Sequence, residues 1–209
     1  MNCLRIFRLK ILLLAFLIFS YSITAETKKL LILGDSISAG YGIKESQNWV
    51  SLIQNEFINS DKKIILINSS VSGDTSVGGV SRISKALDIH KPNFVLIELG
   101  GNDALRGYPI ERIKNNLEKI IELIINQNAK PILMQIKIPP NYGNKYIKAF
   151  ENLYVEISIA QNIPLINFML DNIALNKSLM QPDGIHPNEK AQPLIAVEMG
   201  IALKNIILK

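Results

Sequence analysis

Cysteine, histidine and tryptophan are scarce in this chain of 209 residues. The only cysteine, Cys3, lies in an N-terminal segment that we expect to be removed. The remaining chain then has no thiol, which excludes disulfides and a cysteine hydrolase. There are two histidines, His90 and His186, and neither has a second histidine or a cysteine at helical spacing. We therefore expect no metal and no cofactor, and we place His90 at a helix C-terminus without a catalytic role.

The first 25 residues have the pattern of a secretory signal. Arg5, Arg8 and Lys10 form a basic start, residues 11–19 are an uninterrupted apolar run, and residues 22–25 offer a cleavage site. This predicts a periplasmic or secreted protein with no stable membrane anchor after cleavage. The alternative is an uncleaved anchor, but the apolar run is short for a bilayer crossing, which needs about 20 residues.

Little net charge remains once this segment is removed. The segment carries three of the 23 basic residues and none of the 18 acidic ones, so the formal charge falls from +5 to +2. No cluster of basic residues with interleaved aromatics remains. The composition therefore argues against nucleic acid as a partner.

From Leu30 onward, short apolar runs alternate with segments of helical periodicity. The runs, each typical of a strand covered on both faces, are 30–33, 64–68, 94–99, 132–136 and 164–166. Three intervening segments have one apolar helical face, consisting of Trp49, Leu52, Ile53 and Phe57; Ile110, Ile113, Leu117, Ile120, Ile121 and Ile124; and Ile147, Phe150, Tyr154 and Ile157. This pattern predicts an α/β fold, a three-layer α/β/α sandwich around a parallel five-stranded sheet, in one domain over residues 26–209. A last helix should follow Asn188, but its start is left open because Pro193 would lie too deep in it.

Polar residues follow the predicted strands at the points where they end. Residues 34–36 follow the first strand, 69–75 the second, 100–103 the third and 139–143 the fourth, and residues 183–186 can reach the same edge after the fifth. Ligands of open α/β sheets bind beyond the carboxyl ends of the strands. We therefore expect one site at this edge.

The chemistry available at this edge is that of nucleophilic catalysis. A serine hydroxyl is a weak nucleophile at neutral pH and needs an imidazole to accept its proton and a carboxylate to orient that imidazole. Ser36, His186 and Asp183 supply one residue for each role. The Gly-x-Ser-x-Gly elbow of the α/β-hydrolases is absent, and here the acid precedes the histidine by only three residues.

Four blocks, in order, resemble the SGNH (GDSL) hydrolase superfamily. They are Gly34 to Gly42 (GDSISAGYG), Ser72 to Thr75 (SGDT), Gly100 to Asp103 (GGND) and Asp183 to Asn188 (DGIHPN). Residues 100–107 and 134–143 further resemble its bacterial multifunctional thioesterases, which also act as lysophospholipases. The resemblance covers residues 29–205 and implies a flavodoxin-like sheet. It also implies that Ser36, Asp183 and His186 are catalytic and that backbone N–H groups of Ser36 and Gly73, with the Asn102 amide, form the oxyanion hole.

Each of these residues also has a purely structural interpretation. Ser36 could cap the helix after the first strand, and Asp35 is expected to order the turn rather than to do chemistry. Gly73 could serve only to allow a positive φ, and Asn102 only to form a turn. His186 and its neighbouring aspartate could belong to a surface loop, but Ser36 would then have no base.

The segment after Asn102 carries the expected substrate contacts. In the resembled enzymes this loop shifts over bound acyl chains; Leu105 and Tyr108 would offer apolar surface, with Gly107 as a pivot. Tyr142 either lines the same cleft or packs under the loop, and the sequence does not separate these two interpretations.

Three functional hypotheses follow. The first is a secreted, monomeric serine acyl hydrolase, a thioesterase, lysophospholipase and arylesterase acting on small-molecule acyl thioesters and esters. The second keeps the fold but makes the substrate an acetylated carbohydrate, for which stacking aromatics are usual, whereas Trp49 better fits a helix core face. The third is a noncatalytic lipid-binding protein, which would have no need for an Asp/His pair beside a serine.

Overall fold

The computed structural model describes residues 27–58 and 64–209. The predicted signal, residues 1–25, lies outside the described residues. The strands are β1 (Lys28–Gly34), β2 (Ile64–Asn68), β3 (Phe94–Glu98), β4 (Lys130–Met134) and β5 (Leu165–Ile166). They pair in parallel in the order β2-β1-β3-β4-β5, which is the flavodoxin-like order expected from the resemblance.

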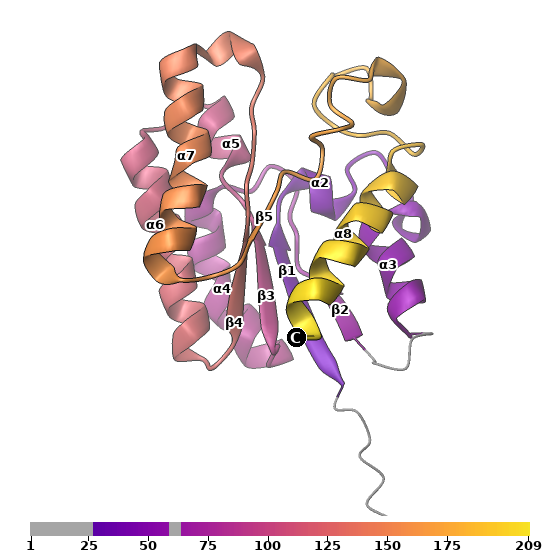
Figure 1. The fold of residues 1–209 in the computed structure, drawn as a ribbon, viewed down its shortest axis with the longest axis vertical. Coiled ribbons are helices and arrows are strands. Elements are labelled where there is room, and N and C mark those ends of the chain that lie inside the picture. The colour runs from indigo at the N-terminus through magenta and orange to yellow at the C-terminus, as the bar shows by residue number, and fades with distance from the viewer. Residues whose placement is uncertain (1–26, 59–63) are drawn as a thin grey trace, which may run out of the picture.

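Helices cover both faces of this sheet. They are α2 (Ser36–Ala39), α3 (Trp49–Ile58), α4 (Ser76–His90), α5 (Gly101–Leu105), α6 (Ile110–Asn126), α7 (Asn144–Gln161) and α8 (Gln192–Ile207). Short 3₁₀ turns occur at η1 (Glu45–Gln47), η2 (Pro140–Tyr142) and η3 (Lys177–Leu179). Figure 1 shows α4, α6 and α7 on one side of the sheet and α3 and α8 on the other. The three-layer α/β/α sandwich is thereby confirmed.

The apolar faces read from the sequence form the core between these layers. Residues 30–33 of β1 are fully buried, as expected for a strand covered on both faces. Trp49 is fully buried on α3, as its helical spacing predicts. The stripe on α6 is fully buried from Ile113 to Ile124, while Ile110 at the start of the helix is only partly covered.

Several strand ends shift by one or two residues from the predicted runs, and two boundaries involve prolines. β4 begins at Lys130, two residues before the predicted apolar run, so Pro131 lies inside a central strand. The N–H of Lys130 donates to the carbonyl of Asn93, just before β3, and the N–H of Leu133 donates to that of Pro164, just before β5. Because successive N–H groups of a strand face opposite neighbours, the N–H that Pro131 lacks would face the β5 side. At that level of the sheet β5 has not yet begun. No ladder hydrogen bond is lost there. α8 begins at Gln192, which puts Pro193 in the first helical turn, where its missing N–H has no partner to lose.

The sheet brings the ends of its strands to one edge, and three helices begin there. α2 follows β1 after one residue, and α5 follows β3 after two. α4 begins at the same edge because Asp103, buried on α5, accepts hydrogen bonds from the N–H and hydroxyl of Ser76 (2.8 and 2.6 Å). His90 is the last residue of α4, at the opposite end. None of the helices within the described ranges has the length and apolar character that a membrane crossing requires.

Candidate active site

Ser36 is the first residue of α2, directly after the turn that ends β1. The cap of this helix is Asp35 and not Ser36, because the Asp35 carboxylate accepts the N–H of Ile37 at 3.0 Å. Asp35 thus orders the turn as the sequence predicts. The Ser36 hydroxyl is not used as a cap and contacts His186 instead, with 2.8 Å between Oγ and Nε2.

His186 and Asp183 form a compact turn between η3 and α8. His186 Nδ1 lies 2.7 Å from one carboxylate oxygen of Asp183. The other oxygen accepts the backbone N–H groups of Ile185 and His186 at 2.9 and 3.0 Å. Although partial burial acts to raise it, the pKa of Asp183 falls to about 2, because these N–H groups and the His186 ring stabilise the anion. Asp183 is therefore ionised at neutral pH and holds the imidazole from one side.

This turn is attached to the segment after α2 by Gln181 and Tyr41. Gln181 Nε2 donates to the backbone carbonyl of Tyr41 at 2.7 Å and to that of Pro187 at 3.1 Å. The Tyr41 ring lies against the His186 imidazole, with 4.6 Å between the ring centroids. The imidazole is thereby confined by an aromatic ring on one side and oriented by a carboxylate on another.

Gly73 and Asn102 lie in the wall of the same cavity as Ser36 and His186. Gly73 has φ +79° in the turn before α4, a conformation that favours glycine, so its structural interpretation holds as well. Asn102 lies in α5, and its side-chain nitrogen donates to Asp35 at 3.1 Å. The fold therefore gathers the predicted residues of all four sequence blocks around one space.

The cavity has a volume of about 800 Å³ and a mainly apolar wall. Its apolar lining includes Leu105, Ile136, Ile138, Pro139, Pro140, Phe168, Leu170, Leu175, Met180 and Ile185. Of the three predicted substrate contacts, Leu105 is in this wall, whereas the structure places Tyr108 and Tyr142 outside it. The Tyr142 hydroxyl instead donates to the Leu105 carbonyl at 3.0 Å, and Tyr146 donates to the Tyr108 carbonyl at 2.6 Å. The two tyrosine hydroxyls thus hold the segment that carries Leu105.

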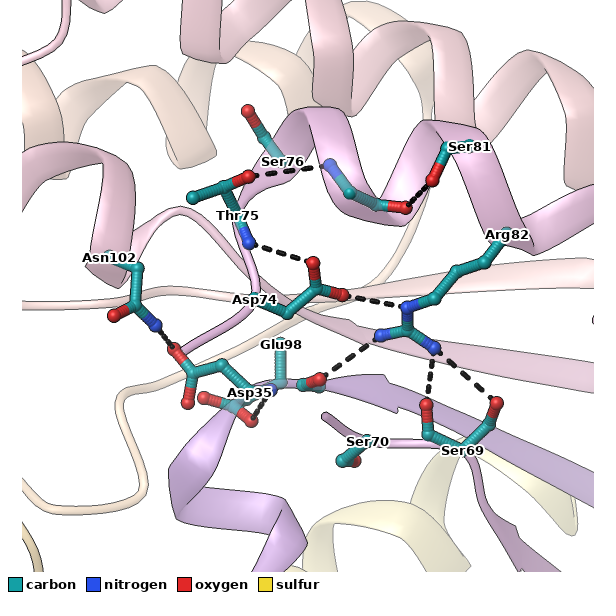
Figure 2. A network of polar contacts seen from close by, with 12 residues as sticks. Asp35, Ser69, Ser70, Asp74, Thr75, Ser76, Ser81, Arg82, Glu98 and Asn102 are labelled. Atoms are coloured by element: carbon teal, nitrogen blue, oxygen red, sulfur yellow. Dashed lines mark hydrogen bonds and ion pairs between the residues drawn. The ribbon is translucent and has the colours of Figure 1, made fainter. Parts of the chain in front are cut away.

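Two polar residues behind the site were not singled out from the sequence. Glu98, the last residue of β3, is buried and accepts the N–H of Asp35 at 3.1 Å. Arg82 of α4 donates from Nε to Asp74 at 2.7 Å and from its other nitrogens to the carbonyls of Gly34 and Ser69 (Figure 2). The sequence offered one signal, and only for Glu98: this residue is a carboxylate inside the apolar run 94–99. A charged residue in a strand that is expected to be buried indicates a specific role, because burying it without a partner is costly.

The arrangement can remove a proton from the Ser36 hydroxyl and return it. Nε2 of His186 faces Oγ, and Nδ1 faces a carboxylate, so the tautomer with hydrogen on Nδ1 is favoured and Nε2 is left as the acceptor. Within the described ranges, no three side chains of metal-binding type come together.

The sequence matches the GDSL-like lipase/acylhydrolase family over residues 32–193. The chain belongs to this family. The Vibrio mimicus arylesterase is 42% identical over 170 residues, which are 81% of this chain and 85% of the relative. The thioesterase 1/protease 1/lysophospholipase L1 of Escherichia coli K12 is 41% identical over 183 residues, 88% of this chain and 86% of the relative.

Solved structures place the fold in the same GDSL-like group. The psychrotrophic esterase EstA from a Pseudoalteromonas species, in a structure inhibited by monoethylphosphonate, has a TM-score of 0.85 and 43% identity. That match covers 87% of this chain and all of EstA. The crystal structure of TesA has a TM-score of 0.82 and 39% identity, covering 85% of this chain and 99% of TesA. As a member of the GDSL-like lipase/acylhydrolase family, the chain is an ester hydrolase.

Proposed function

We propose that this protein is an exported serine acyl hydrolase that cleaves acyl thioesters and carboxylic esters through a covalent acyl-enzyme on Ser36. The observation that carries this proposal is the 2.8 Å contact between Ser36 Oγ and His186 Nε2 in the wall of an apolar cavity of about 800 Å³. A hydroxyl and a base at hydrogen-bond distance are the signature of an activated nucleophile.

In the proposed first step, Ser36 Oγ attacks the acyl carbonyl carbon while His186 Nε2 takes the hydroxyl proton. Asp183, ionised and 2.7 Å from Nδ1, stabilises the imidazolium that results. The bond between the carbonyl carbon and the leaving oxygen or sulfur then breaks, and His186 gives its proton to that atom. A water molecule releases the acyl group in the second step: His186 takes a proton from the water and returns it to Ser36 Oγ.

The tetrahedral intermediate of each step carries a negative oxygen. The proposed donors to it are the backbone N–H groups of Ser36 and Gly73 and the side-chain nitrogen of Asn102, which belong to residues of the same cavity wall. Such donors act where charge develops in the transition state, and losing one typically costs about 10² to 10³ in rate.

The cavity wall supports medium to long acyl chains as the substrate class. Apolar side chains make up most of the lining beyond the serine, and an acyl chain gains about 0.8 kcal/mol for each buried methylene. Relatives named as thioesterase, lysophospholipase and arylesterase are about 40% identical to this chain. Because the leaving groups of these substrates differ, the names support a site that recognises the acyl part of the substrate more than the leaving group. The N-terminal pattern of residues 1–25 supports export to the periplasm or beyond, and a monomer is the proposed state.

The test is hydrolysis of p-nitrophenyl esters from acetyl to palmitoyl by wild type and Ser36→Ala, with palmitoyl-CoA and lysophosphatidylcholine as further substrates. Ser81→Ala, a serine on the exposed side of α4, is the matched control. We expect activity to peak at medium or long chains, to be lost in Ser36→Ala and to persist in Ser81→Ala. Activity on acetyl esters alone would favour the carbohydrate esterase, and a folded but inert wild type would favour lipid binding without catalysis.

A further inference from the structure

Two buried carboxyl groups lie behind the nucleophile, and the proposed mechanism uses neither. Asp35 is 5% exposed and Glu98 is 1% exposed. The backbone N–H of Asp35 donates to Oε2 of Glu98 at 3.1 Å, and the two side chains are also hydrogen-bonded to each other. A hydrogen bond between two carboxyl groups requires a proton on one of them.

The surroundings assign this proton to Glu98. Burial and the nearby charge of Asp35 raise the pKa of Glu98 well above its ordinary value, and they outweigh the lowering effect of the Ser38 hydroxyl and the Asp35 backbone N–H. Burial also raises the pKa of Asp35, to about 6, but the N–H of Ile37, the Glu98 side chain, the charge of His186 and the Asn102 amide all act in the opposite direction. At neutral pH Glu98 is therefore a neutral acid that donates, and Asp35 is a carboxylate that only accepts.

The ionised Asp35 carboxylate accepts two hydrogen bonds that matter for the site. Its Oδ1 takes the N–H of Ile37, which fixes the start of α2, and its Oδ2 takes Nδ2 of Asn102 at 3.1 Å (Figure 2). An amide nitrogen carries two hydrogens. One is bound by Asp35, and the second is left for the cavity that Asn102 lines.

We propose that Glu98 and Asp35 are positioning residues, which act through Asn102 by holding its amide nitrogen toward the reacting carbonyl oxygen. This inference rests on the proposed function, in which Asn102 stabilises the oxyanion. Because Asp35 offers only acceptors, the opposite orientation of the Asn102 amide would place its oxygen against a carboxylate. By donating a hydrogen bond to the Asp35 carboxylate, Glu98 keeps that side chain in the required orientation and keeps it ionised.

The close approach of Glu98 depends on Gly34. A Cβ at that position would lie 2.5 Å from Oε2 of Glu98, which is far inside contact distance. The first glycine of the GDS block therefore has a function in this chain apart from backbone freedom: it leaves the space that the buried acid occupies.

The experiment compares Glu98→Gln, Glu98→Leu and Asp35→Asn, each in the wild-type and in the Asn102→Ala background. Glutamine can donate to Asp35 and accept its backbone N–H, whereas leucine can do neither. Asparagine at position 35 keeps a carbonyl oxygen for the Ile37 cap but turns an NH₂ group toward that of Asn102. The readouts are kcat and KM on p-nitrophenyl butyrate, together with thermal unfolding.

We expect Glu98→Gln to stay within about threefold of wild type in kcat, and Glu98→Leu and Asp35→Asn to lose about tenfold or more with KM nearly unchanged, because the oxyanion exists only in the transition state. In the Asn102→Ala background the same two changes should have little further effect, since the residue through which they act is gone. Should Glu98→Leu fail to fold, the cycle of Asp35→Asn with Asn102→Ala carries the test.

Two other results separate this inference from the function on which it rests. Full activity of Asn102→Ala would overturn the proposed oxyanion hole itself. If Asn102→Ala loses activity while Asp35→Asn and Glu98→Leu act independently of it, with effects that multiply, the proposed function stands and the positioning role is wrong.

Discussion

The guanidinium of Arg82 donates from Nη2 to the backbone carbonyl of Gly34 at 3.1 Å, so a side chain of α4 holds the end of β1. The same guanidinium donates to the Ser69 carbonyl after β2 and, from Nε, to Asp74 at 2.7 Å. Asp74 directly follows Gly73. One planar, forked donor therefore links the end of β1 to the loop after β2, and Figure 2 shows the Arg82 guanidinium between Ser69 and Asp74 of that loop. The two linked segments adjoin Ser36 and Gly73, whose backbone N–H groups are proposed for the oxyanion hole.

Arg82→Ala should lower both stability and activity. The change removes the cation that pairs with the mostly buried Asp74 carboxylate, which keeps only the N–H of Thr75, and one donor each from the carbonyls of Gly34 and Ser69. We expect this to cost about 3 kcal/mol of unfolding free energy and at least tenfold in kcat. Arg82→Lys should be intermediate, because an ammonium cannot reproduce the fork. Urea unfolding and ester hydrolysis measure the two effects. Lys119→Ala, which removes an exposed pair with Glu122, is the control and should stay within about 0.5 kcal/mol.

Asp183→Asn should reduce kcat by about 10³- to 10⁴-fold with little change in fold. The asparagine oxygen can still accept the N–H groups of Ile185 and His186, but its NH₂ would face Nδ1 of the ring. That favours hydrogen on Nε2, so the imidazole can no longer accept the Ser36 proton. Steady-state kinetics and circular dichroism check the prediction, with Asp88→Asn on the exposed side of α4 as control. A variant that kept a tenth of the wild-type rate would contradict the role of Asp183.

Gly34→Ala should destabilise the protein by about 1 to 3 kcal/mol through steric overlap. The new methyl group would lie 2.5 Å from Oε2 of Glu98 and 2.8 Å from the Ser70 hydroxyl. Gly200→Ala is the control: the nearest atom there is at an ordinary 3.7 Å and alanine favours the helix, so stability should rise slightly. Thermal unfolding of both variants measures the difference, and equal unfolding temperatures would contradict the crowding at Gly34.

Glu98→Gln should become stabilising relative to wild type as the pH rises. The pKa of Glu98 is raised in the folded state, so the stability that its bound proton contributes is fully present below the ordinary value of 4.5 and is lost as the pH rises toward the folded pKa. Glutamine resembles the protonated acid at every pH. The unfolding temperatures of the two proteins should therefore be similar at pH 4 and should diverge, in favour of Glu98→Gln, between pH 5 and pH 9. A constant difference across this range would contradict a neutral Glu98.

The sequence predicts most of the fold because its signals are local. Fully apolar runs and one-faced helices identify the layers, and only a few boundaries shift, as at Pro131, where the register with β5 decides whether a missing N–H matters. The four motif blocks likewise identify Ser36 and His186 without knowledge of their contact.

The residues that support the site could not be predicted in the same way. Arg82 and Gly34 are 48 residues apart, and Asp35 and Glu98 are 63 apart, so their contacts exist only once the strands are ordered. The positions of Tyr108 and Tyr142 depend on how the segments after β3 and β4 pack together. An aromatic ring in a loop indicates apolar surface but not whether it faces a cavity.

The turn that holds Asp183 and His186 is internally complete. Its carboxylate binds the ring and two backbone N–H groups within three residues, so the relative position of acid and base is set before the turn meets the sheet. Its attachment to the rest of the molecule uses other contacts, through Gln181 to Tyr41 and through Asn188 to the carbonyls of Ser178 and Met180. The stretch between β5 and η3, residues 167–176, makes none of these contacts and borders the cavity through Phe168, Leu170 and Leu175, so a change there can reshape the cavity while Asp183 and His186 keep their relative position. In this architecture, the shape of the cavity can change without changing the geometry between the carboxylate and the imidazole.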